Sequence, residues 1–191
     1  MFVSTVLITT NSFSYDSDPK AFIAELVDDA IKTLGDKNIQ ILEKNKKIEI
    51  IALQNIDINA LSMYTLGPIR KTLDQITLEK YKFLFEKYFL KSLTSRLTDY
   101  SSNTFEVVSS EKKSSNYTIV KSKIAKSENQ PEIKIDWRVY TKIPKEPLIR
   151  DLIIEGLSLA RTQKEEFASI LNSNDGDIDA LFKSLRDFSK K

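Results

Sequence analysis

The stretch that decides the fold runs from Ile133 to Leu171 and reads IKIDWRVYTKIPKEPLIRDLIIEGLSLARTQKEEFASIL. Its opening residues alternate, which predicts a strand with one dry face and one wet face. The dry face consists of Ile133, Ile135, Trp137 and Val139, and the wet face of Lys134, Asp136, Arg138 and Tyr140. After a Pro144/Pro147 turn we expect a second strand that ends at Gly156. Ser158 then caps a helix, whose inward residues are Leu159, Ala160, Phe167, Ile170 and Leu171.

Two more predicted strands precede this stretch. They are TFEVVSSE (Thr104–Glu111) and NYTIVKSKIAK (Asn116–Lys126), both rich in β-branched residues. A turn at residues 127–130 leads from them into Pro131. Four consecutive strands joined by short turns predict an antiparallel meander with one solvated face.

The longest predicted helix runs from Asp74 to Tyr100 and is unusually aromatic. One stripe contains Leu78, Tyr81, Phe85, Phe89, Leu93 and Tyr100. Such a stripe is most often plain core, and it becomes a cavity wall only if the facing sheet stands off from it. We expect Phe85, Phe89 and Tyr100 to confront the dry strand face. In a lipid cavity, a tryptophan at Val139 would then displace lipid without destabilising the fold, whereas in tightly packed core it would overpack the site and destabilise the protein.

Composition excludes several classes of protein. The chain has 29 Lys and Arg residues and 27 Asp and Glu residues, which leaves a formal charge of +2. This near balance does not suggest that the protein binds nucleic acid. Cysteine and histidine are absent, so the chain lacks thiol chemistry, the commonest metal ligand and the usual general base. Carboxylates are grouped only where a solvated helix face or a helix start explains them, at Asp28-Asp29, Glu165-Glu166 and Asp175–Asp179. We therefore predict no catalytic residues, no metal and no cofactor.

The first 14 residues, MFVSTVLITTNSFS, are uncharged and partly apolar. We interpret residues 1–14 as the remnant of a signal peptide or a disordered N-terminus. The alternatives are a frayed end and a short edge strand. Residues 15–191 are expected to form one α+β domain. Because no apolar run of about twenty residues occurs, we expect no membrane span.

The run DLIIEGLSLARTQKEEFASIL (Asp151–Leu171) resembles the signature of the MlaC, or toluene-tolerance, family of periplasmic phospholipid-binding proteins. The matching residues are Asp151, Glu155, Gly156, Ser158 and Phe167. A second likeness lies in NIDINALSMYTLG (Asn55–Gly67), although Ile58 stands where the family has an aromatic residue. Pro147 and Arg150 also depart from the family pattern of the last strand.

The resemblance implies helices packed around a twisted four-stranded antiparallel sheet that encloses an apolar lipid pocket. It implies a soluble periplasmic carrier that holds phospholipid acyl chains. The partners would be an inner-membrane ABC transporter complex and an outer-membrane lipoprotein complex. The predicted lipid-binding residues are Leu66, Phe85, Phe89, Tyr100, Phe105, Ile119, Ile133, Ile135, Trp137, Val139, Ile154 and Leu157. The alternative is a periplasmic module whose apolar groove takes a peptide or a protein. Asp151 and Glu155 are expected to orient the strand–helix corner.

Overall fold

The computed structural model describes residues 15–97, 104–126 and 131–190. The helices are α1 (Pro19–Gly35), α2 (Ile41–Asn55), α3 (Ile58–Leu66), the 3-10 helix η1 (Gly67–Lys71), α4 (Gln75–Leu97), α5 (Leu159–Asn172) and α6 (Ile178–Ser189). The strands are β1 (Phe105–Lys112), β2 (Tyr117–Ile124), β3 (Ile133–Tyr140), β4 (Leu148–Ile154) and β5 (Leu157–Ser158). The expectations for residues 1–14, Tyr100 and the turn at 127–130 fall outside the described residues.

Several helices begin at a residue whose side chain caps the first turn, although Gln40 at the start of α2 forms no such hydrogen bond. Asp18 accepts hydrogen bonds from the Lys20 and Ala21 amides, both at 3.0 Å, at the start of α1. Asp74 does the same for Thr77 at 2.7 Å at the start of α4. These carboxylates satisfy amide groups that the first helical turn leaves without a partner.

The sheet is an antiparallel meander in the order β1-β2-β3-β4-β5. The α+β architecture and the meander are confirmed, but the sheet has five strands rather than four. The second strand of the deciding stretch ends at Ile154, not at Gly156. Glu155 and Gly156 turn the chain with φ of 50° and 82°, so Leu157 and Ser158 fold back as a short fifth strand.

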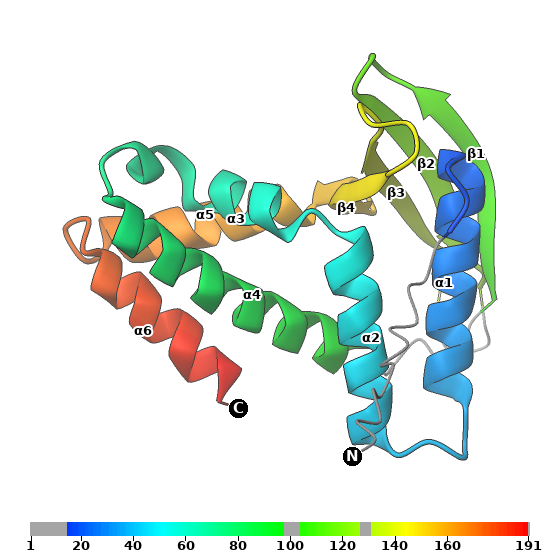
Figure 1. Cartoon of the computed structure of the whole chain (residues 1–191), viewed down its shortest axis with the longest axis horizontal. Helices are drawn as coiled ribbons and strands as arrows, with labels where there is room; N and C mark the ends of the chain where they lie inside the picture. Colours follow the sequence, from blue (N-terminus) through cyan, green and yellow to red (C-terminus); the bar gives the residue numbers. More distant parts are fainter. Residues whose placement is uncertain (1–14, 98–103, 127–130, 191) are drawn as a thin grey trace, which may run out of the picture.

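The described residues form two apolar cores, and half-buried Ile56 packs against both of them. Figure 1 shows the corresponding groups of elements, with the sheet, α1 and α2 on one side and α3, α4, α5 and α6 on the other. The sheet core lies where α1 and α2 pack beside the sheet, and α1 covers β1 and β2. The helical core lies among α3, α4, α5 and α6. Helix α4 runs between the two groups, because its N-terminal half packs with α3 and α6 while its Leu93 reaches the sheet core.

No helix within the described ranges is both long and apolar enough to cross a membrane. In the same ranges, no three His, Cys, Asp or Glu side chains are grouped so as to hold a metal ion.

Candidate functional site

The predicted lipid-binding residues divide between the two cores. Trp137 and Val139 are buried in the sheet core, and Phe105 packs edge-on against the Trp137 ring at 6.2 Å between centroids. The Trp137 indole donates to the Ser122 hydroxyl at 2.8 Å, and Ser122 donates to the Ile135 carbonyl at 3.0 Å. The indole is therefore fixed in position at the centre of the sheet.

Leu66, Phe85 and Phe89 belong to the helical core instead. Phe85 stacks on Phe89 at 6.1 Å and meets Phe167 edge-on at 6.3 Å between ring centroids. Nearby, Tyr81 is fully buried with its hydroxyl 2.9 Å from that of Thr65. Burial raises the pKa of the Tyr81 phenol, which stays neutral in this core.

The expectation that Phe85 and Phe89 confront the dry strand face is wrong. Among the described side chains of α4, Leu93 reaches the sheet core, one turn further along the helix. At about 1.5 Å per residue a helix of this length spans more than one layer of the molecule. Successive turns of one apolar stripe therefore meet different neighbours.

On β3, β4 and β5 the dry face of the sheet becomes more exposed from one cross-strand row to the next, while Ser122 and Ile124 of β2 stay buried. The row of Val139 and Ile149 is 0% and 2% exposed. The next row pairs buried Trp137 with half-buried Leu152. The row after that runs from half-buried Ile135 through half-buried Ile154 to Leu157, which is 69% exposed.

We call Ile135, Leu152, Ile154 and Leu157 the open end of the sheet. All of these residues lie on the side of the sheet that carries Trp137, because cross-strand partners share a face. Half-buried Ile133 lies on this face one row further along β3. Apolar side chains left accessible beside a packed core are a common feature of sites for apolar ligands.

The corner next to the open end is held by Asp151. This carboxylate is 4% exposed. It accepts hydrogen bonds from the Ala160 amide at 3.0 Å and from the Ser158 hydroxyl at 2.7 Å, and its Oδ2 lies 3.6 Å from Nη1 of Arg138. Ser158 in turn caps α5 by accepting from the Arg161 amide at 3.1 Å. Asp151 thus ties β4 to β5 and to the start of α5.

Glu155 fixes the same corner to β3. Its amide donates to the Lys134 carbonyl at 3.0 Å, and its carboxylate accepts from the Lys134 amide. These contacts place the turn against β3. They support the expectation that Asp151 and Glu155 orient the corner.

Arg150, which departs from the family pattern, joins the sheet to α3. Its Nε and Nη2 both lie 2.8 Å from Oδ2 of Asp57, the residue that caps α3. Its Nη1 donates to the Tyr117 hydroxyl at 3.0 Å, and the guanidinium lies 3.5 Å from the centre of the Tyr140 ring. Partial burial opposes the charge, but the hydrogen bonds to Tyr117 and Asp57 outweigh it and raise the Arg150 pKa.

A separate cleft of about 780 Å³ lies on the wet face of the sheet. It is bounded by α3, the start of α5 and the β1–β2 turn, and its lining includes Tyr64, Ile119, Lys121, Asp136, Arg138 and Ile153. Of the predicted site residues, Ile119 faces this cleft rather than the dry face. The sequence pattern missed the cleft because alternating charges on a strand are typical of a solvated face.

Sequence reasoning also missed Leu152 and Leu93. Side chains on one face of a strand are two residues apart, so counting back from Ile154 along β4 would have identified Leu152, which pairs with Trp137. Leu93 was assigned to the aromatic stripe, but nothing in the sequence distinguishes it from Phe89 as the side chain that reaches the sheet core.

Comparison with known proteins gives a family match and a structural match. The profile of the MlaC protein family matches residues 24–187. The fold resembles the structure of a phospholipid-binding protein from Ralstonia solanacearum in complex with a phospholipid. The TM-score is 0.76 at 18% sequence identity, and the alignment covers 91% of this chain and 97% of that chain. No curated protein matches the sequence significantly.

Proposed function

Since the chain belongs to the MlaC family, we propose that it carries phospholipid by holding the acyl chains against the open end of the sheet. The observation that carries the proposal is the row Ile135–Ile154–Leu157, where the dry face continues from the packed core into accessible apolar surface. Because the family consists of non-enzymatic lipid carriers, the prediction that the chain is not an enzyme is confirmed.

The acyl chains would lie between this open end and the part of α4 whose Leu93 packs against the sheet core. Phe89 and Leu93 are half-buried and lie one helical turn apart, at the junction of the two cores. Asp151 and Glu155 would act as positioning residues that hold Leu157 at the rim. Residues 15–191 would work as one lipid-binding unit.

The energetics favour exchange between a membrane and the protein. Two acyl chains contain roughly thirty methylenes, and exposing them to water costs on the order of 20 kcal/mol at about 0.8 kcal/mol each. A bilayer and an apolar pocket shelter the chains equally well, so transfer from one to the other can be nearly neutral. The carrier removes the barrier to moving acyl chains through water. The direction of transport must then come from a partner.

The family supports a proposal for the compartment and the partners. We place the carrier in the periplasm. It would shuttle lipid between an outer-membrane lipoprotein complex and an inner-membrane ABC transporter. This would maintain the lipid asymmetry of the outer membrane.

The test is to identify what copurifies with the protein. Organic extraction and mass spectrometry should find phospholipid in near-stoichiometric amount. Leu157→Asp should lower the lipid content several-fold without unfolding the protein, because this side chain is 69% exposed. A charged side chain at the rim opposes entry of the chains.

The matched control is Leu53→Asp. It puts the same charge at a leucine that is 46% exposed on α2, and it should leave the lipid content unchanged. An extract without lipid, from a protein that instead retains a peptide, would favour the alternative of a peptide-binding or protein-binding groove.

A further inference from the structure

Helix α2 is apolar on two opposite sides. Its inward side carries Ile48 and Ile51, which are buried in the sheet core. Its outward side carries Leu42, Ile50 and Leu53, which are 65%, 44% and 46% exposed. A surface helix packs onto its domain through one apolar side. The second, outward apolar side is therefore not explained by the packing of this domain.

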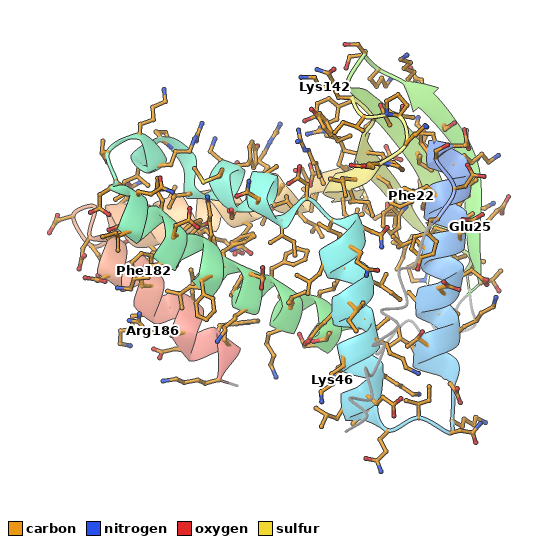
Figure 2. All side chains as sticks on the ribbon, viewed as in Figure 1. Phe22, Glu25, Lys46, Lys142, Phe182 and Arg186 are labelled. Carbon is orange, nitrogen blue, oxygen red and sulfur yellow. The ribbon has the colours of Figure 1, made fainter. Side chains whose placement is uncertain are left out.

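The outward side has the spacing of a coiled-coil seam. Leu42, Lys46, Glu49 and Leu53 follow one another at intervals that alternate between four and three residues. This is the spacing of the a and d positions of a heptad, which share one stripe of a helix. Figure 2 marks Lys46 on the N-terminal half of α2.

The stripe is complementary to itself when a second copy is placed antiparallel to it. With a two-fold axis between Lys47 and Ile48, Leu42 faces Leu53 of the partner subunit. Lys46 then faces Glu49 of the partner subunit, and each pair occurs twice by symmetry. A parallel arrangement would set Lys46 against its own copy and Glu49 against its own copy, which like-charge repulsion opposes.

The charges on the stripe are available for such pairing. Lys47 pairs with Glu43 at 3.4 Å, and Lys44 donates to the Leu34 carbonyl. Neither Lys47 nor Lys44 belongs to the stripe of Leu42, Lys46, Glu49 and Leu53. Within the part of the chain that the structure describes, Lys46 and Glu49 form no ion pair.

We infer that the outward side of α2 is the interface of a weak homodimer, in which two α2 helices pack antiparallel with a central layer of Lys46–Glu49 pairs between layers of leucine. A single helix pair of this length buries less than the roughly 800 Å² per partner of a standard stable interface. The dimer should therefore dissociate on dilution. The inference does not depend on lipid binding.

Sedimentation velocity over a range from about 5 to about 500 µM tests this, because a weak dimer changes its population across that range. The wild-type protein should shift from monomer toward dimer. Lys46→Glu and Glu49→Lys should each stay monomeric, because each places like charges opposite one another. The double variant Lys46→Glu/Glu49→Lys should dimerise again.

Mixing the two single variants makes the sharpest test. In a heterodimer of Lys46→Glu with Glu49→Lys, position 46 of each subunit faces an opposite charge at position 49 of the other. Dimer should therefore return in the mixture. A wild type that is monomeric throughout, single variants that still dimerise, or a mixture that stays monomeric would each overturn the inference. Circular dichroism melting should show that every variant is folded, since these positions lie on the outward side of the helix.

The absence of cysteine from the chain allows an independent check. Leu42→Cys mixed with Leu53→Cys should give a disulfide-linked dimer on oxidation, and neither variant alone should do so. In the antiparallel register, two copies of position 42 lie about 16 Å apart, beyond disulfide reach. Efficient cross-linking of a single variant alone would overturn the register.

A membrane is the other surface that an exposed apolar stripe could meet. Vesicles of phosphatidylethanolamine and phosphatidylglycerol should not retain the protein through this face. Cosedimentation with them that Leu42→Asp abolishes, from a protein that is otherwise monomeric, would assign the face to a membrane and overturn the dimer.

Discussion

At the scale of single residues, Asp151 shows how a carboxylate that looks catalytic can be structural. It is buried, and its two oxygens accept from the Ala160 amide and the Ser158 hydroxyl. Asp151→Asn would keep an acceptor for one donor and turn an amide NH₂ group toward the other. We expect unfolding in urea to show a loss of about 1–3 kcal/mol, the usual cost of a buried polar group left without its partner.

Ser158→Ala is the control for this prediction. It removes one donor to Asp151 and the cap of α5 but leaves the Ala160 contact, so it should also cost about 1–3 kcal/mol, while the Asp151 carboxylate itself stays in place. Asp151→Asn should also lower lipid retention, because Leu157 lies on the strand that Asp151 holds. A well-folded Asp151→Asn protein that had lost only a hydrolytic activity would contradict the structural role.

At the scale of elements, the turn at Glu155 and Gly156 creates β5 and so completes the open end. Gly156 has φ of 82°, and a Cβ built on it would meet nothing within 4 Å. The cost of Gly156→Ala is therefore confined to the backbone and should be roughly 1–2 kcal/mol in the unfolding free energy. We expect lipid content to fall as well, because strain in this turn acts on Leu157.

Gly176→Ala provides the matched comparison. Gly176 has φ of 81° and equally open surroundings, but it lies in the turn between α5 and α6. Its substitution should lower the unfolding free energy by a similar amount and leave lipid content unchanged. Equal loss of lipid in both variants would mean that lipid follows global stability rather than the geometry of β5.

The same elements show what the sequence can predict. Alternation identified β3 and both of its faces, because one face meets a core and the other meets water. The long helix was predicted as well, but not which of its turns meets which core. A helix that is apolar around most of its circumference carries no directional signal, so Phe89 could not be told from Leu93. A strand of two residues produces no pattern either, which is why β5 was missed.

At the scale of the whole molecule, the dry face of the sheet serves two purposes along its length. Its buried end, at Val139 and Ile149, is packed core shared with α1 and α2. Its open end, at Ile135 and Ile154, is half-buried. The predicted lipid-binding residues therefore include side chains in close-packed surroundings and side chains that are partly accessible to solvent. A substitution that adds volume distinguishes these two groups of residues. Close-packed core does not tolerate the added volume, whereas a space that lipid would fill does.

Val139→Trp and Ile135→Trp form that pair. At Val139, which is 0% exposed, the added ring should overpack the core and destabilise the protein by about 1–3 kcal/mol. At Ile135, we expect the ring to occupy space that acyl chains would fill. The melting temperature of Ile135→Trp should lie within about one or two degrees of that of the lipid-free wild type, as expected for a small change in stability. The variant should nevertheless retain several-fold less phospholipid. Calorimetry and lipid extraction on both proteins measure the two effects separately. If Ile135→Trp lost stability and kept its lipid while Val139→Trp did the reverse, the acyl chains would lie at the buried end of the face, and the open end would be ordinary core.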